Sequence, residues 1–419
     1  MKTIGKAVSL VMAALIMFGM LAACNGSTTP GTADNSGTGG DSTAAAPPAA
    51  AAVTLKLWGS QEDQAMLNEM VAAFKAANPD KTYDIQLGVV SEADAATRVL
   101  EDPAAAADVF VFANDQIRTL VKAGALYEVT RNKDAIIAAN MPSSIEACEI
   151  NGELYAYPMT ADNGYFLYYD KSVLSDSDVA TLDGIMAKAN AAGKKVFMDV
   201  SNGYYIASFF LGAGCKLEIG ADEKQICDFN SATGVQVGEA IKAFTADPAF
   251  NTGDDAVLTS GIGTTICAAV SGIWNASAIE GILGDNFGAT KLPTFTLDGK
   301  QVQMGGFAGF KLLGVNSSTA SPLDAMALAE WLINEENQIK RYEVRGMGPS
   351  NLNAGASQAV KDNIPLAALG SQYAFASSQK DVLGSYWGPA EAFGTAMEAK
   401  DYGMSIQEQL DAMVAQITQ

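Results

Sequence analysis

Acidic and aromatic side chains dominate the residues of this chain that could do chemistry, because histidine is absent altogether. The absence excludes Ser-His-Asp and Cys-His catalytic groups, His-ligated zinc and an imidazole pH switch. The 13 Tyr, 17 Phe and 4 Trp residues leave recognition by flat aromatic surfaces open. With 47 Asp and Glu against 26 Lys and Arg, the net charge is -21. A nucleic-acid binder needs a basic surface, so the charge argues against that class.

Three of these side chains follow or adjoin predicted strands. Trp58 ends the alternating run that starts at Val53, and Asp115 follows the apolar run 109–112. Ligands of α/β sheets bind at the carboxyl ends of strands, so both are site candidates, with Glu62 as a further partner. Asp115 can accept hydrogen bonds from ligand hydroxyl groups, or it can cap the next helix. The alternatives are core packing for Trp58 and a solvated first-turn acid for Glu62.

Alternating strands and helices must position these residues. Apolar periodicity predicts this order along residues 53–123, which indicates a doubly wound α/β lobe. The dipeptide Asn151-Gly152 predicts a hairpin, and a strand follows at 166–169. The rest of the chain is more helical. The predicted strands are 53–58, 85–89, 109–112, 196–197, 267–270 and 310–315, and the predicted helices of the first part are 63–77, 91–100 and 116–123.

The first 52 residues predict export and attachment to a membrane. Lys2 and Lys6 flank the start of an apolar segment, so residues 1–23 are typical of a secretory signal peptide. The motif Leu21-Ala22-Ala23-Cys24 resembles a bacterial lipobox, which implies that Cys24 is lipidated and becomes the first mature residue. Residues 24–52 contain no core-forming side chain after Cys24 and predict a disordered linker. We therefore expect a soluble body, lipid-anchored on the extracytoplasmic face of the cell membrane.

The remaining motifs predict no cofactor and no metal. The glycine clusters 261–263 and 305–309 lack the strand–GxxxxGK[ST]–helix context of a phosphate loop, and no cysteine spacing fits zinc. Cys215 and Cys227 could form a disulfide across a hairpin, with unpaired buried thiols as the alternative. Trp331 lies on the apolar face of a predicted helix and is assigned to the core.

A series of short motifs shares its order with a known family. The mature chain resembles the extracellular solute-binding proteins of ABC sugar importers, most closely the maltose/maltodextrin-binding proteins, over most of residues 53–419. The motifs that carry the resemblance are Leu55-Lys56-Leu57-Trp58, the segment from Asp108 to Asp115, Ala123-Gly124-Ala125-Leu126, the segment from Asn151 to Pro158, Tyr169-Asp170-Lys171, Leu292-Pro293-Thr294-Phe295 and Gly346-Met347-Gly348-Pro349-Ser350.

The resemblance implies a two-lobed α/β clamshell of the type II periplasmic-binding-protein class. It places three crossings between the lobes, near Thr160, Phe307 and Leu352. The N-terminal lobe would comprise 53–160 plus 308–352, and the C-terminal lobe 161–307 plus 353–419. Ligand would bind in the cleft between the lobes, and closure of the hinge would create the surface read by a membrane permease.

The resemblance also implies residue roles. Trp274, Trp387 and Tyr204 would stack on sugar rings, with Tyr205 competing for the role of Tyr204. Asn114 and Asp115 belong to the segment that delivers a carboxylate, although Gln116 stands where the family often has Arg. One of Asp162 and Asn163 would be a second polar partner. Tyr157 and Tyr165 would either contact ligand or fill the core.

These implications predict a non-catalytic, monomeric binding protein rather than an enzyme. It would capture maltose, maltotriose or longer α-glucans and deliver them to the permease subunits of an ABC transporter. Two alternatives stay open: an exported glycan-processing enzyme and a binding lipoprotein for a non-glucose oligosaccharide. A glycosidase needs only two carboxylates about 5–10 Å apart, and the chain has many carboxylates.

Overall fold

The computed structural model describes residues 52–419. The predicted signal peptide at 1–23, the lipidated Cys24 and almost all of the predicted linker lie outside the described residues. Within 52–419, no helix has both the length and the apolar character needed to cross a membrane.

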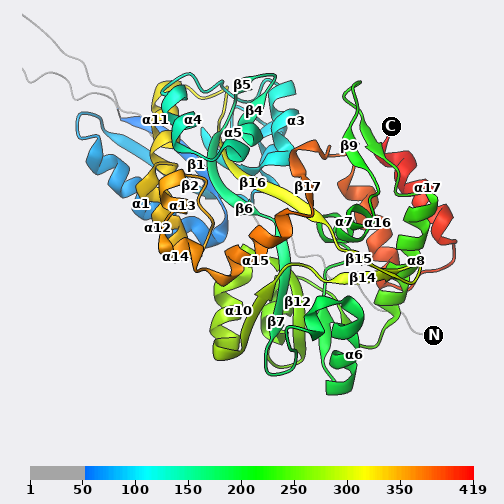
Figure 1. Cartoon of the computed structure of the whole chain (residues 1–419). Helices are drawn as coiled ribbons and strands as arrows, with labels where there is room; N and C mark the ends of the chain where they lie inside the picture. The colour runs from blue at the N-terminus through cyan, green and yellow to red at the C-terminus, as the bar shows by residue number, and fades with distance from the viewer. Residues whose placement is uncertain (1–51) are drawn as a thin grey trace, which may run out of the picture. The chain divides into compact units, whose positions relative to one another are not determined.

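The first sheet has six strands and is built mainly from the N-terminal part of the chain. Its order is β17-β16-β3-β1-β2, and β6 pairs with β16. Figure 1 shows β6 beside β16. The strand β1 runs parallel to β2 and β3, whereas β16 is antiparallel to β3 and β6. The strands are β1 (Val53–Gly59), β2 (Tyr83–Val89), β3 (Val109–Ala113), β6 (Tyr157–Asn163), β16 (Gly306–Val315) and β17 (Ala376–Ser378).

The second sheet has five strands in the order β11-β8-β12-β7-β13. In β7, Tyr165, Leu167 and Tyr169 enter one core cluster, and Phe166 and Tyr168 enter another. Successive side chains of a strand point to opposite faces, so this sheet is covered on both faces. Its strands are β7 (Tyr165–Asp170), β8 (Lys195–Phe197), β11 (Phe250–Asn251), β12 (Ile266–Gly272) and β13 (Phe287–Thr290).

Three two-stranded pairs complete the described strands. In the first pair, Asn151 (φ 55°) and Gly152 (φ 83°) both adopt the left-handed conformation that a tight hairpin turn requires, as predicted. The pairs are β4 (Glu149–Ile150) with β5 (Glu153–Leu154), β9 (Leu217–Ile219) with β10 (Gln225–Cys227), and β14 (Thr294–Leu297) with β15 (Lys300–Gln303).

Helices cover both sheets. A large core cluster joins β1, β3 and β16 to α1, α11 and neighbouring helices, and Trp331 of α11 packs against it as predicted. The helices before β6 and those between β16 and α15 are α1 (Gln64–Ala77), α2 (Ala95–Glu101), α3 (Ile117–Lys122), α4 (Lys133–Ala139), α5 (Pro142–Cys148), α11 (Pro322–Leu332), α12 (Glu335–Arg345), α13 (Leu352–Gly355) and α14 (Gln358–Lys361). The others are α6 (Leu182–Ala192), α7 (Gly203–Gly212), α8 (Ala232–Ala246), α9 (Asp255–Gly261), α10 (Ala276–Leu283), α15 (Ile364–Tyr373), α16 (Trp387–Glu398) and α17 (Ile406–Ile417).

The chain first passes from one sheet to the other through a one-residue link. Only Gly164 separates β6 of the first sheet from β7 of the second (Figure 1). A Cβ atom at Gly164 would lie 2.7 Å from the Leu369 side chain and 3.0 Å from the Phe307 carbonyl oxygen, so this link has no room for a side chain. The chain returns through β16, and it crosses again between α12 and α15, which packs against β7 and β13.

The disulfide considered between Cys215 and Cys227 is not formed: both cysteines are buried and free. Strand pairing supplies the reason. In the β9–β10 ladder, Cys227 lies opposite Leu217, so Cys215 is two residues out of register with it. A cross-strand disulfide needs two directly facing Cβ atoms, and this register does not provide them. Cys215 and Cys227 are unpaired buried thiols, which is the alternative given from the sequence.

Candidate functional site

A cavity of ≈ 890 Å³ lies where strand ends of both sheets meet. Residues after β1 and β3 line it from the first sheet, and Phe197 at the end of β8 and Trp274 after β12 line it from the second. The first turns of α7 and α16 supply further lining side chains. The carboxyl ends of strands are where α/β folds bind their ligands, so this cavity is the candidate site.

Three large aromatic side chains form platforms in the cavity. Tyr204, Trp274 and Trp387 line it and are each partly exposed. The Tyr204 ring stacks on the buried Phe307 ring, with centroids 5.7 Å apart and 22° between planes. Trp387 meets the same Phe307 edge-on at 6.0 Å. Since Phe307 supports both platforms, their ring planes are fixed before any ligand binds.

Local sequence explains why two of these rings face the cavity. Tyr204 is held in the first turn of α7, where the Asn202 side chain caps the helix by accepting a hydrogen bond from the Tyr204 N–H. Trp274 lies over Gly272, at which a Cβ atom would come within 2.0 Å of the indole ring. The glycine therefore lets the indole lie directly against the backbone.

Carboxylates greatly outnumber cations on the cavity wall. The lining cations are Lys311 and Arg345, and both are engaged in ion pairs, with Glu92 (3.1 Å) and Asp63 (3.0 Å) respectively. Burial alone would raise the pKa of Glu92, but the Lys311 ammonium holds that pKa below its ordinary value. The lining carboxylates are Glu62, Glu92, Asp94, Asp115, Asp199, Asp254, Asp255 and Glu391. With its cations occupied, the wall offers hydrogen-bond acceptors and disfavours an anionic ligand.

Asp115 is a lining carboxylate that other residues of the site contact directly. It lies in the 3₁₀ segment Asn114–Gln116 after β3, and one carboxylate oxygen accepts a 3.0 Å hydrogen bond from the Gln379 amide. Burial raises the pKa of Asp115 to about 7, although hydrogen bonds, including those from Gln379 and Trp387, act in the opposite direction. Asp115 therefore changes its protonation state near neutral pH.

The structure brings together some of the residues predicted for the site. Glu62, Asp115, Asn163, Tyr204, Trp274 and Trp387 all line the cavity, as does Tyr205, the competitor of Tyr204. Of the pair Asp162 and Asn163, Asn163 is the one at the cavity. The Asp162 carboxylate points elsewhere and accepts a 2.6 Å hydrogen bond from the Gly348 N–H. Adjacent strand residues face opposite ways, which accounts for the difference.

Four further predicted residues do not line the cavity, each for a packing reason. Trp58 lies across Gly88 of β2 and against the first core cluster. Tyr157 is 1% exposed within that cluster. Tyr165 is also buried, and its ring supports Tyr204 edge-on at 4.7 Å. Asn114 is buried and accepts a hydrogen bond from the Phe310 N–H, so it fixes the segment that carries Asp115.

Several lining residues were not predicted from the sequence. Gln379 lies between β17 and α16, Glu391 lies within α16, and Lys311 lies inside the apolar strand β16. An isolated charge in an apolar run was a usable signal for Lys311, because a buried ammonium needs a carboxylate partner. Gln379 had no such signal, since its contacts involve residues more than 200 positions away.

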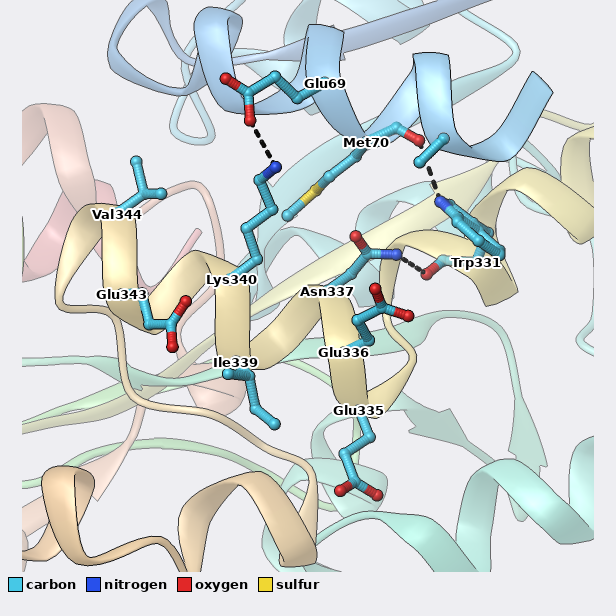
Figure 2. A pocket seen from close by; sticks show the side chains of 11 residues that line it. Glu69, Met70, Trp331, Glu335, Glu336, Asn337, Ile339, Lys340, Glu343 and Val344 are labelled. Atoms are coloured by element: carbon cyan, nitrogen blue, oxygen red, sulfur yellow. Dashed lines mark hydrogen bonds and ion pairs between the residues drawn. The ribbon is translucent and has the colours of Figure 1, made fainter. Parts of the chain in front are cut away.

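A second cavity, of ≈ 670 Å³, lies on the surface between α1 and α12. Figure 2 shows Glu69 paired with Lys340 at this groove, and the Trp331 indole N–H bonded to the Met70 carbonyl oxygen. Trp331 is thus held by the neighbouring helix instead of offering a free ring face. The groove is lined only by residues of α1, α11 and α12, so it lacks the lining from both sheets that the larger cavity has.

Among residues 52–419, no three His, Cys, Asp or Glu side chains are grouped so as to hold a metal ion. The larger cavity combines aromatic faces, hydrogen-bond acceptors and paired charges.

Comparison with known structures shows close similarity over the described chain. A protein solved with acarbose superimposes with a TM-score of 0.80 at 29% identity, covering 88% of this chain and 99% of that one. The maltodextrin-binding protein of L. casei BL23 gives a TM-score of 0.73 at 29% identity, covering 88% and 100%. The maltotriose-binding protein of Thermus thermophilus shares the fold, with a TM-score of 0.74 at 18% identity over 87% of this chain and 99% of that one. The predicted two-lobed type II fold is confirmed.

Sequence comparison gives the same relationship. The maltotriose-binding protein of Pyrococcus abyssi (strain GE5 / Orsay) is 23% identical over an alignment of 305 residues, and the match covers 67% of this chain. The match spans 63% of the length of that relative. The model of the family described as bacterial extracellular solute-binding protein matches residues 69–368. That match covers most of both sheets and most of the cavity lining, and the chain therefore belongs to the bacterial extracellular solute-binding protein family.

Proposed function

We propose that this protein binds neutral oligosaccharides of the maltodextrin type in the cavity between its two sheets and releases them unchanged to the permease of an ABC transporter. Maltose, maltotriose and longer α-glucans are the proposed ligands. A glucose ring has apolar C–H faces and a rim of hydroxyl groups, so it needs flat aromatic partners and edge-on acceptors.

One observation carries the proposal: Tyr204, Trp274 and Trp387 line the same cavity as Asp115, Asn163 and Glu62. Aromatic faces from the second sheet and α16 meet acceptors that follow strands of the first sheet. Both lining cations are already paired with carboxylates, which favours a neutral ligand over a phosphorylated or acidic one. The maltotriose-binding and maltodextrin-binding names of the relatives support the same ligand class.

Isothermal titration calorimetry of the purified protein with maltose, maltotriose and maltotetraose tests the proposal. We expect one molecule bound per chain, a ligand-dependent rise in Tm and full recovery of intact sugar by chromatography. A control series of cellobiose and cellotriose, with the same rings in another linkage, should bind more weakly. Hydrolysis or transfer of the sugar would favour the alternative of a glycan-processing enzyme. Preference for another oligosaccharide would favour the alternative of a non-glucose ligand.

We also propose the membrane anchor and the domain division that the sequence predicts. The motif Leu21-Ala22-Ala23-Cys24 supports acylation of Cys24, which would keep a monomeric binding protein near its permease on the extracytoplasmic face. The proposed lobes are 53–160 plus 308–352 and 161–307 plus 353–419. Metabolic labelling with a palmitate analogue checks the anchor, because Cys24→Ser should abolish the label and release the protein from the membrane fraction.

A further inference from the structure

The short 3₁₀ segment Gln379–Asp381 is held from both sides. On one side, the Lys380 ammonium donates to the carbonyl oxygens of Glu146 and Glu149, both at 2.6 Å. The Arg118 guanidinium of α3 pairs with Asp381 at 3.2 Å. These contacts fix the segment on α3, on α5 and on the start of β4.

On the other side, a single amide clamps the end of the same segment. The Gln225 side chain of β10 donates to the Asp381 carbonyl oxygen at 3.2 Å and accepts from the Leu383 N–H at 2.6 Å. The backbone that carries Gln379 is thus fixed from two directions, and the Gln379 side chain itself is only 4% exposed.

Both ends of the Gln379 amide contact predicted ligand-binding residues. Its N–H donates to Asp115 at 3.0 Å, and its oxygen accepts from the Asn163 amide at 3.0 Å. The packing around it is tight, because a Cβ atom at Gly309 would lie 2.1 Å from the Gln379 oxygen. Above its pKa of about 7, the Asp115 carboxylate is ionised and can only accept hydrogen bonds. Asp115 therefore requires the amide nitrogen of Gln379, which turns the Gln379 oxygen toward Asn163.

The direction of these two bonds determines what the cavity offers to a ligand. Asn163 must present its amide nitrogen to Gln379, so its Oδ1 atom is left as the free end of the side chain. Asn163 and Asp115 both line the cavity, and each then presents an oxygen acceptor. Such a pair recognises ligand groups that donate hydrogen bonds, such as the hydroxyl groups of a sugar.

We propose that Gln379 is a positioning residue that imposes the order Asn163 → Gln379 → Asp115 on these hydrogen bonds, so that both outer side chains present acceptors to ligand hydroxyl groups. The proposal rests on the proposed saccharide-binding function and adds to it a residue that acts through its two neighbours. The residue that sets the direction of these hydrogen bonds thus lies in a segment, Gln379–Asp381, that carries no sequence motif.

A charge-swap experiment tests the direction of the bonds. Gln379→Glu removes the donor and places a second carboxylate against Asp115, and we expect maltotriose affinity to fall by about tenfold or more. Adding Asp115→Asn restores the pattern, because the amide introduced at position 115 can donate to the carboxylate introduced at position 379 while Asn163 still donates to it. We expect the double variant to bind maltotriose about tenfold more tightly than Gln379→Glu alone. Gln416→Glu introduces the same charge on the exposed face of α17 and should leave affinity unchanged.

The outcomes separate this proposal from the proposed function. If wild-type protein binds maltotriose but the double variant is no better than Gln379→Glu, the ordered hydrogen bonds are rejected and the proposed function stands. If wild-type protein binds no α-glucan, the proposed function fails. In that case, the Tm values of the sugar-free wild type, Gln379→Glu and the double variant test the hydrogen bonds. A lower Tm in Gln379→Glu and a recovered Tm in the double variant would support them.

Discussion

The Tyr204 hydroxyl donates a 3.0 Å hydrogen bond to the main-chain carbonyl oxygen of Asn163. This bond joins the first turn of α7, beside the second sheet, to the last residue of β6 in the first sheet. Gly164, the one-residue link between β6 and β7, follows immediately. An aromatic platform of the cavity is thus fixed directly to a crossing between the sheets, so movement of that crossing changes the position of the ring.

The two indole platforms give the first prediction. Trp274→Ala or Trp387→Ala should weaken maltotriose binding by about 1–3 kcal/mol each, because stacked contact and buried apolar area are lost. Isothermal titration calorimetry measures the effect. Trp331→Ala is the matched control: it should lower the free energy of unfolding by about 3 kcal/mol, with affinity unchanged. Unchanged affinity in both platform variants would mean that the ligand binds elsewhere.

Gly272 gives a second prediction, because Trp274 lies directly over it. Gly272→Ala would place a Cβ atom 2.0 Å from the indole, so the ring must move and maltotriose affinity should fall about as far as in Trp274→Ala. Gly281→Ala in α10 is the control, because no atom beyond its chain neighbours and its own helix backbone lies within 4 Å of an added Cβ. That control should keep its affinity and gain about 0.5–1 kcal/mol of stability. Equal affinity in the two glycine variants would contradict the assigned role of the ring.

Asp115 predicts a pH dependence of binding. Its pKa is raised to about 7 by burial, and its ionised form is the better acceptor for hydroxyl groups. Affinity for maltotriose should therefore fall as the pH is lowered from about 8 to about 6. Calorimetry across this range in wild type and Asp115→Asn provides the measurement. A slope that persists in Asp115→Asn would assign the dependence to another group.

The Asp115 carboxyl also makes stability depend on pH: as the pH rises, we expect affinity to increase but the free energy of unfolding to decrease. Folded Asp115 keeps its proton up to about pH 7, whereas the ordinary carboxyl loses it near 3.8. Between these values the folded state binds more protons, so the contribution of Asp115 to the free energy of unfolding decreases as pH rises. Urea unfolding at several pH values should show a shallower decrease in Asp115→Asn than in wild type. Identical slopes would argue against the raised pKa.

The Lys311–Glu92 pair gives a prediction about a buried charge. Lys311→Met leaves the Glu92 carboxylate buried without its partner at 3.1 Å, and the free energy of unfolding should fall by about 3–5 kcal/mol. Adding Glu92→Gln removes the unpaired charge and should recover most of that loss. Guanidinium unfolding of the two variants checks it, and a double variant as unstable as Lys311→Met alone would show that the pair is not the cause.

Much of this arrangement could be predicted from the sequence. Alternating apolar residues indicated the strands of the first sheet, and the family resemblance identified Tyr204, Trp274 and Trp387 as residues of one cavity. The choice between Asp162 and Asn163 could not be made, since a one-residue change in strand register exchanges the two faces. Gln379 was missed because its partners, Asp115 and Asn163, are 264 and 216 positions away and only the folded chain brings them together.

The distribution of the four tryptophans has an optical consequence. Trp274 and Trp387 line the cavity, whereas Trp58 and Trp331 pack against the core of the first sheet. Emission from the first two indoles should respond to occupancy, and emission from the other two should remain a constant background. The molecule therefore carries an intrinsic fluorescence reporter, with its reference built into the same chain.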